Sequence, residues 1–281
     1  MSYPSNNNTN INNELYSNLV TASQFAAYEN SIARQLVTVF DAPLNTGLSL
    51  QVPVWSSIAA DLITDEAAAS AKTTNTTSRI ITLQEHVVYH QITDQLKDSA
   101  YTNVFSQIGE QSGRAIAESM DKQVFSQFAN FSSDIGTSGK KLLVSDILKA
   151  AATLRANKLT GPFYAIVHPG SAYSLKANLT ATTAYTAVSN AGNRVLDSFY
   201  VGSIAGVDIY ESSLVSTSGN DAVNGVFVSG ALGQAMRGTV EMNTLYLPAN
   251  RATDVVLKAV AGANVLQSGF GVAITADYRI G

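Results

Sequence analysis

The sequence predicts an α+β fold, in which a long hairpin and a long helix precede a group of later strands. Apolar residues alternate with other residues over Leu48–Val54, and a second strand-like run returns to Ile92. A helix-compatible segment without proline follows from Asp94 to Ala129, and at 1.5 Å per residue it spans about 50 Å. Three strand-like segments, within residues 239–280, close the chain.

The hairpin is too long to bury its own apolar face, because two strands alone are marginally stable in water. Pro53 marks the first strand as an edge strand, and residues 56–78 at the tip are rich in Ala, Thr, Ser and Asp. No other part of the sequence is dedicated to covering this ribbon. We therefore expect it to pack on a second copy of the same chain.

Composition narrows the functional classes. The chain has 281 residues and a net charge of −4, with 46% hydrophobic but only 14% charged residues, which indicates surface buried by partners. It has no cluster of Lys and Arg, so sequence-specific nucleic-acid recognition is not expected. The lack of cysteine excludes disulfides and Cys-ligated zinc. Neither a signal peptide nor a membrane span is expected.

The first half of the chain reads as an arm followed by the hairpin and the helix. Residues 1–13 are polar and rich in Asn, and residues 15–40 combine a short helix with an extended end. Asp94 is expected to cap the long helix. Gly109 and Gly113 mark a place where another element could approach that helix closely.

The second half alternates short helices and strands. Ser145 is expected to open a helix, and Pro169 opens another directly after a buried strand at residues 163–168. The other expected elements are an exposed loop at 180–193, two short strands around Gly202 and Gly206, a strand at 225–230, and a helical turn at 231–238.

Three histidines and two glycine-rich segments are the first candidates for chemistry. His86 and His90 share one face of a strand without the three or four convergent ligands of a metal site, so a polar strand face is favoured. His168 follows a strand and opens a helix, which favours a structural cap over a catalytic base. The glycines of residues 230–238 and 268–274 match neither a P-loop nor a dinucleotide fingerprint.

Charged residues of the hairpin tip are the remaining candidates. Asp65 and Glu66 lie among small residues without an apolar pocket, which indicates a solvated loop. Lys72 is either a solubilising charge or a contact to an acidic neighbouring subunit. No catalytic, cofactor-binding or metal-binding residue is assigned, and the chain is not expected to be an enzyme.

The order of these parts resembles the tailed-phage major capsid proteins of the Hong Kong 97-like fold. The entry to the hairpin (Thr46, Gly47, Pro53, Val54, Trp55) and its return (Thr82, Glu85, Val87, Tyr89, Ile92, Thr93, Asp94) resemble the extended loop of that family. Residues 163–175 are similar to its strand–His-Pro–helix element, and residues 200–215 to its Gly-containing hairpin. The resemblance covers nearly the whole chain.

The resemblance implies a division of the chain: an N-terminal arm at 1–45, an extended loop at 46–92, a peripheral domain with the spine helix at 93–140 and 238–281, and an axial domain at 141–237. It implies pentamers and hexamers of an icosahedral head around double-stranded DNA, in which the loop lies over the neighbouring subunit. Some relatives crosslink a loop lysine to an asparagine; Lys72 is the sole loop lysine, and no partner for it is assigned.

The implied partners are further copies of the chain, a portal, a decoration protein, and a separate scaffolding protein, since only a short arm precedes the loop. Contact with packaged DNA would be non-specific, and no membrane is involved. The implied location is the virion, after assembly in the host cytoplasm. Two alternatives stay open at this point: an encapsulin-type compartment shell, and an α+β enzyme with His168 as its base.

Overall fold

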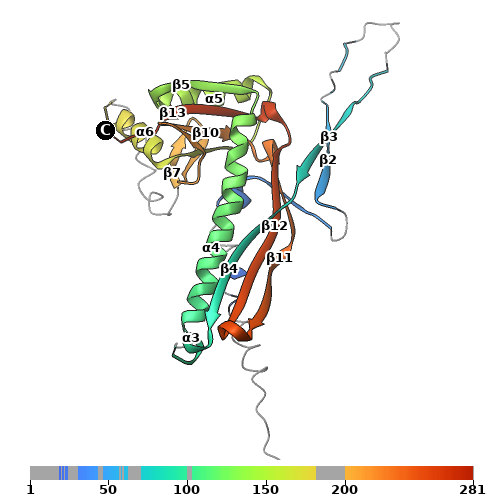
Figure 1. The fold of residues 1–281 in the computed structure, drawn as a ribbon. Helices are drawn as coiled ribbons and strands as arrows, with labels where there is room; N and C mark the ends of the chain where they lie inside the picture. The colour runs from blue at the N-terminus through green and yellow to red at the C-terminus, as the bar shows by residue number, and fades with distance from the viewer. Residues whose placement is uncertain are drawn as a thin grey trace, which may run out of the picture.

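The computed structural model describes residues 31–43, 47–56, 60–62, 71–99, 103–181 and 200–280, together with residues 19, 21, 23, 24 and 58. Two sheets, a separate two-stranded ribbon and the long helix α4 make up the fold (Figure 1). Its described helices are α2 (Ala33–Leu36), α3 (Asp94–Ser99), α4 (Asn103–Phe125), α5 (Val144–Ala156) and α6 (Pro169–Ala181), and a 3-10 turn, η1 (Ser126–Asn130), continues α4.

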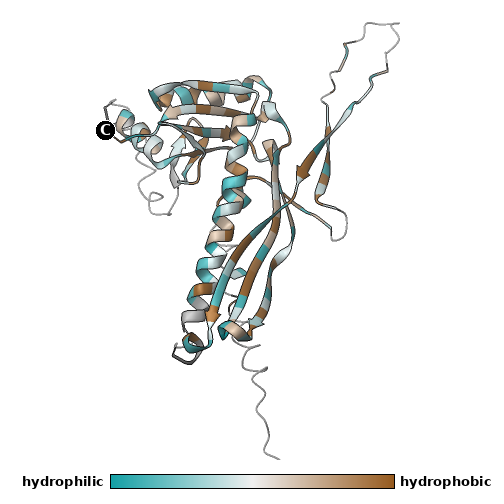
Figure 2. Ribbon diagram, in the orientation of Figure 1, coloured by the Kyte–Doolittle hydropathy of each residue, from teal (hydrophilic) through white to brown (hydrophobic). Residues whose placement is uncertain are grey.

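The four-stranded sheet lies along α4 and has the order β1 (Thr38–Asp41), β11 (Leu232–Leu247), β12 (Ala252–Val265), β4 (Gln84–Thr93). Alternate residues of β12, including Val255 and Leu257, point to α4 and pack against Ile116 and Met120. This alternation of apolar and polar residues along the strands can be followed in Figure 2. One face of the sheet is therefore buried by the helix.

The second sheet has seven strands and forms the upper part of the molecule in Figure 1. Its order is β5 (Ser133–Lys141), β13 (Gly271–Asp277), β10 (Asp221–Phe227), β6 (Phe163–Val167), β8 (Val207–Glu211), β7 (Tyr200–Ile204), and the short β9 (Thr217–Ser218) pairs with β10. Buried residues of α5 and α6, including Ile147, Leu154 and Leu175, form a core with this sheet. Strand β13 thus lies with residues 163–227, although it follows β12 in the chain.

Phenylalanines join the end of α4 to the seven-stranded sheet. The Phe128 ring lies 5.6 Å from the rings of Phe125 and Phe227 and 5.9 Å from that of Phe131, measured between centroids. Gly225 makes room for this ring, because a Cβ there would lie 2.7 Å from it. The glycine-rich segment near Gly271 has the same use, since a Cβ at that position would lie 2.3 Å from Phe131.

The expectation of one ribbon from residue 48 to residue 92 is wrong in its second half. The return strand is divided at Leu83, so that β3 (Thr76–Thr82) pairs with β2 (Ser49–Trp55) whereas β4 pairs with β12. The physical reason is that β12 offers β4 ten consecutive partners, Ala252–Ala261. The apolar face of the remaining ribbon is also covered within the subunit, where Val52 and Ile81 are buried.

The long helix is confirmed as a long helical region but is capped differently. Residues 94–130 comprise α3, α4 and η1, with residues 100–102 outside the described chain. The Thr93 hydroxyl, rather than Asp94, accepts the Leu96 N–H at 3.3 Å. The Asp94 carboxylate instead accepts a hydrogen bond from the Tyr246 hydroxyl at 2.9 Å.

In the second half, the strand β6, the helix start at Pro169 and the hairpin β7–β8 match the predicted elements. Helix α5 begins one residue before Ser145, and the Asp146 carboxylate accepts the Leu143 N–H at 3.2 Å. The predicted helical turn at 231–238 is wrong, because residues 232–247 pair with β12 over their length and with β1 at their start. The predicted loop beyond Ala181 lies outside the described residues.

The N-terminal arm packs along α4. Leu19 and Ser23 are fully buried, and Leu19 lies in the core between α4 and the four-stranded sheet. A Cβ at Gly113 would lie 2.2 Å from the Ser23 carbonyl oxygen, which confirms this glycine as a point of close approach. The arm then continues into β1, which pairs with β11 in parallel.

Replacing Gly113 with alanine tests this contact, because the contact determines whether the change lowers or raises the free energy of unfolding. In an exposed helix the change would stabilise the protein by about 1 kcal/mol through helix propensity. Against the Ser23 carbonyl we expect it to destabilise instead, by about 1–3 kcal/mol. Chemical denaturation of the purified protein measures the difference.

A truncated chain lacking residues 1–30 is the control for that experiment. In it the same Gly113→Ala change should become stabilising, because the obstructing carbonyl is gone. A stabilising effect in the full-length chain would contradict the packing of the arm on α4.

Candidate assembly surfaces

The ribbon of β2 and β3 is fixed to the body at its base. The Arg237 guanidinium donates a hydrogen bond to the Gly47 carbonyl, and the Asn264 amide donates to the Ile80 carbonyl at 2.7 Å. The Leu83 N–H donates to the Leu48 carbonyl at 2.8 Å. The base of the ribbon is therefore tied to β11 and β12, and its direction is set by the four-stranded sheet.

Farther from the body, the ribbon exposes large apolar side chains. Trp55 is 66% exposed, Ile58 56% and Leu62 102%, and Ile80 is half-exposed on the same outward side as Trp55. Figure 1 shows the ribbon projecting away from both sheets. Exposed apolar residues concentrated on a projecting segment are typical of an interaction surface.

Lys72 makes a contact within its own loop. Its ammonium group lies 2.7 Å from the Asp61 carboxylate, and both side chains are more than 40% exposed. Such an exposed pair contributes less than about 1 kcal/mol to stability. The intersubunit role of Lys72 stays a prediction, and Asp65 and Glu66 lie outside the described residues.

His86 and His90 point from β4 to α4, on one face of the strand as predicted. His86 Nδ1 lies 2.7 Å from the Ser119 hydroxyl, and His90 Nε2 lies 2.8 Å from the Ser112 hydroxyl. Burial lowers the pKa of the His86 imidazole. Each histidine thus joins the strand to the spine helix, and the two do not converge on a common centre.

His168 occupies the turn from β6 to α6. Its backbone N–H donates to the buried Asn224 side chain at 2.8 Å, while its Nδ1 accepts the Gly170 N–H at 3.2 Å. The ring packs 4.5 Å from that of Tyr278, between centroids, and burial lowers the pKa of the imidazole. This geometry describes a helix cap, as the sequence predicted.

A buried carboxylate fastens the arm to the spine. Asp121 is 1% exposed and accepts hydrogen bonds from the Ser31 hydroxyl at 2.6 Å and from the Ile32 N–H at 2.8 Å. Burial raises the pKa of the Asp121 carboxyl, and these hydrogen bonds act in the opposite direction. The carboxylate thereby satisfies the donors at the start of α2.

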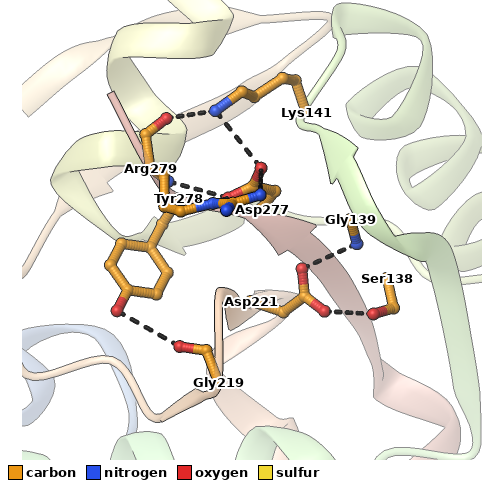
Figure 3. Close-up of polar contacts among 8 residues, drawn as sticks. All are labelled: Ser138, Gly139, Lys141, Gly219, Asp221, Asp277, Tyr278 and Arg279. Carbon is orange, nitrogen blue, oxygen red and sulfur yellow. Dashed lines mark hydrogen bonds and ion pairs between the residues drawn. The ribbon is translucent and has the colours of Figure 1, made fainter. Parts of the chain in front are cut away.

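The C-terminal segment is held by a second charged cluster, drawn in Figure 3. The Arg279 guanidinium and backbone N–H donate to the Asp277 carboxylate at 3.0 Å, and Lys141 Nζ lies 3.5 Å from the same group. The Arg279 hydrogen bonds hold the pKa of the Asp277 carboxyl well below its ordinary range. Beside them, Asp221 accepts hydrogen bonds from Ser138 and from the Gly139 N–H.

A family model described as phage capsid protein matches residues 76–281, which is most of the chain. The chain belongs to the phage capsid protein family. The match covers the spine helix, the seven-stranded sheet and all of the four-stranded sheet except β1. No curated protein matches the chain significantly.

Solved capsid structures share the fold of this phage capsid protein. The capsid of cyanophage P-SCSP1u is 17% identical, covers 86% of this chain and 87% of its own, and gives a TM-score of 0.64. Mycobacterium phage Adephagia gives 15% identity, coverage of 90% and 92%, and a TM-score of 0.64. The head of Helicobacter pylori bacteriophage KHP40 is 9% identical, covers 89% of this chain and 91% of its own, and gives a TM-score of 0.66.

The solved phage capsids confirm the predicted Hong Kong 97-like fold class, and the family confirms the predicted function as a phage capsid protein. The protein is therefore a structural component of the virion. None of its described helices is long and apolar enough to cross a membrane. Within the described part of the chain, no group of three or more His, Cys, Asp or Glu side chains could hold a metal ion.

Sequence reasoning missed the two anchors of the capsid protein's chain ends. Asp121 carried a signal, because it interrupts an apolar stripe of the spine helix beside Met120 and Val124 and so had to find partners. The cluster around Asp277 carried none, since Lys141 and Asp221 are distant in sequence and meet only through the pairing of β5, β13 and β10.

The Asp277 cluster predicts a pH dependence of capsid-protein stability. Because the pKa of Asp277 is lowered in the folded state, its contribution is complete above about pH 4 and is lost as the pH falls further. Asp277→Asn should therefore lower the melting temperature near pH 7, and the difference from wild type should shrink below about pH 4. Differential scanning calorimetry across this range measures it.

Glu118→Gln, at an exposed position of α4, is the matched control and should leave the melting temperature unchanged at each pH. An Asp277→Asn difference that is as large at pH 3 as at pH 7 would refute the assignment.

Proposed function

We propose that the protein assembles into pentamers and hexamers of an icosahedral head that encloses double-stranded DNA. The observation that carries the proposal is the projecting ribbon, whose outward face exposes Trp55 and Ile80 and whose loop exposes Leu62. A fully exposed leucine on an extended loop gains stability only from a second surface. Contacts between unlike surfaces of identical subunits close into rings when the rotation permits.

The proposed domain boundaries follow the pairing of strands within each sheet. The peripheral domain comprises α3, α4, β4, β11 and β12, while the axial domain comprises residues 133–227 and the strand β13. This proposed division differs from the one expected from the sequence, because β4 joins the peripheral domain whereas β5 and β13 join the axial domain. The boundary at residue 237 falls inside β11, and β13 pairs with β5 and β10 rather than with β12.

The loop of residues 47–82 is proposed to lie over the neighbouring subunit. Its base is fixed by its own subunit, where Val52 and Ile81 are buried, so the neighbour is proposed to contact the outward face and the exposed Ile58 and Leu62. Each subunit would thus be folded on its own, and its projecting loop would bind the neighbouring subunit. The area buried in a permanent shell of this kind is on the order of 1,000 Å² or more at each interface.

We further propose that the protein has no catalytic role and that assembly takes place in the host cytoplasm with a separate scaffolding protein and a portal. DNA would be enclosed without specific recognition, since the chain has a net charge of −4. A decoration protein on the outer surface belongs to the same proposal.

Electron microscopy and light scattering of the protein expressed with its neighbouring genes test the function directly. Closed particles of uniform size, or five- and six-fold rings, are the expected result. A monomer or small dimer at every salt and protein concentration would overturn the proposal.

Shortening the loop should separate folding from assembly. Replacing residues 57–74 with Asn-Gly retains the pair of Ser56 and Asn75, whose backbone hydrogen bond is 3.1 Å, and suits a two-residue turn. We expect a melting temperature close to that of wild type, because the buried base is untouched, but no closed shells in electron micrographs.

Thr73→Ala is the control, since it keeps the loop and changes a single exposed side chain. It should form shells as wild type does. Normal shells from the shortened variant would show that the loop is not needed between subunits.

A further inference from the structure

Strand β4 is an open edge of the four-stranded sheet. It pairs with β12 over ten residues without a register shift, and no described strand pairs with its other side. The opposite edge of the sheet is formed by β1, which has only four residues. A long edge presents a row of backbone N–H and C=O groups that another strand can use.

This edge lacks the usual protection against pairing. Residues 84–93 contain no proline, glycine or lysine, the strand has no bulge, and Glu85 is its one carboxylate. On its outward face, Val87 and Tyr89 are 52% and 55% exposed. Natural proteins blunt such edges unless another strand is added there, so the edge points to strand addition by a partner.

The sequence of β4 is complementary to itself in one antiparallel register. When two copies are centred on Val88, each Val87 lies opposite the other copy's Tyr89, and Glu85 lies opposite Gln91. On the inward face, His86 lies opposite His90. Every pair keeps its face, like-charged carboxylates do not meet, and the aromatic–β-branched pairs are stabilising.

We propose that β4 pairs with β4 of a second copy on a two-fold axis through Val88, which makes one eight-stranded sheet from two subunits. The proposal rests on the self-association proposed above. It adds an isologous contact that differs from the contact made by the loop.

The spine helix leaves room for this pairing. The inward side chains His86, Val88 and His90 are partly buried against α4, and no described strand pairs with the edge beside them. Ser112 and Ser119, which contact the two histidines, are small, and Ala115 between them is exposed. Small side chains allow two helices to approach within about 8–10 Å, the usual interaxial distance.

A cysteine scan tests the axis, because the protein has no cysteine of its own. In Val88→Cys, the two new thiols would lie directly opposite each other, within the 4.4–6.8 Å that a disulfide spans between Cα atoms (about 5 Å in this pairing). Assembled particles treated with a mild oxidant and separated on a non-reducing gel should show disulfide-linked dimers.

Tyr89→Cys is the matched control on the same strand. Its two copies would lie diagonally, about 8 Å apart, beyond the reach of a disulfide. We expect at least about tenfold less dimer than with Val88→Cys. The double variant Val87→Cys/Tyr89→Cys should restore the crosslink, since each cysteine then faces the other, and it provides a second test if Val88→Cys fails to fold.

The outcomes separate this inference from the proposed function. Particles without a Val88→Cys crosslink, or with equal crosslinking of both single variants, would overturn the two-fold pairing and leave the capsid function intact. A crosslinked dimer without particles would support the pairing while the shell proposal fails. Neither particles nor crosslinks would overturn both.

Discussion

The fold depends on the stacking of phenylalanines where the spine helix ends. Phe125, Phe128 and Phe131 lie on the last turns of the helical region and on the residue after it, and their core includes residues from both sheets, among them Val265 and Phe227. Aromatic pairs of this geometry contribute about 0.5–1.5 kcal/mol beyond their buried area. This core therefore joins the two sheets at the end of the spine helix.

The joint also explains why several glycines cannot be replaced by larger residues. Gly225 and Gly271 lie against the Phe128 and Phe131 rings at distances that leave no space for a Cβ. Gly225 lies inside β10, within the strand predicted from residue 225, and Gly271 begins β13. Their role is packing, and it becomes visible only when the rings that need the space are placed.

Local patterns in the sequence predicted the elements but not all of their partners. The sequence predicted the helix start at Pro169, the strand before it and the strand β2, because such elements depend on neighbours in the chain. It did not predict the division of the return strand at Leu83, because that division depends on pairing with β12, about 170 residues later. Likewise, residues 232–238 looked helical but are held as a strand between β1 and β12.

The anchoring of the arm follows from two residues of the spine, Gly113 and Asp121, whose contacts with Ser23 and Ser31 run in the same direction along helix and arm. The arm is therefore part of the subunit's own core as far as Leu19. The ribbon, in contrast, projects from this core with Trp55 and Leu62 exposed.

The phenylalanine joint has a consequence for the curvature of a shell. Packed aromatic cores resist gradual deformation, because a displaced ring loses its contacts before it finds new ones. The spine and the upper sheet should then turn as one rigid plate. If the protein forms hexamers and pentamers as proposed, the difference in angle between them would arise at the contacts between subunits rather than within each subunit.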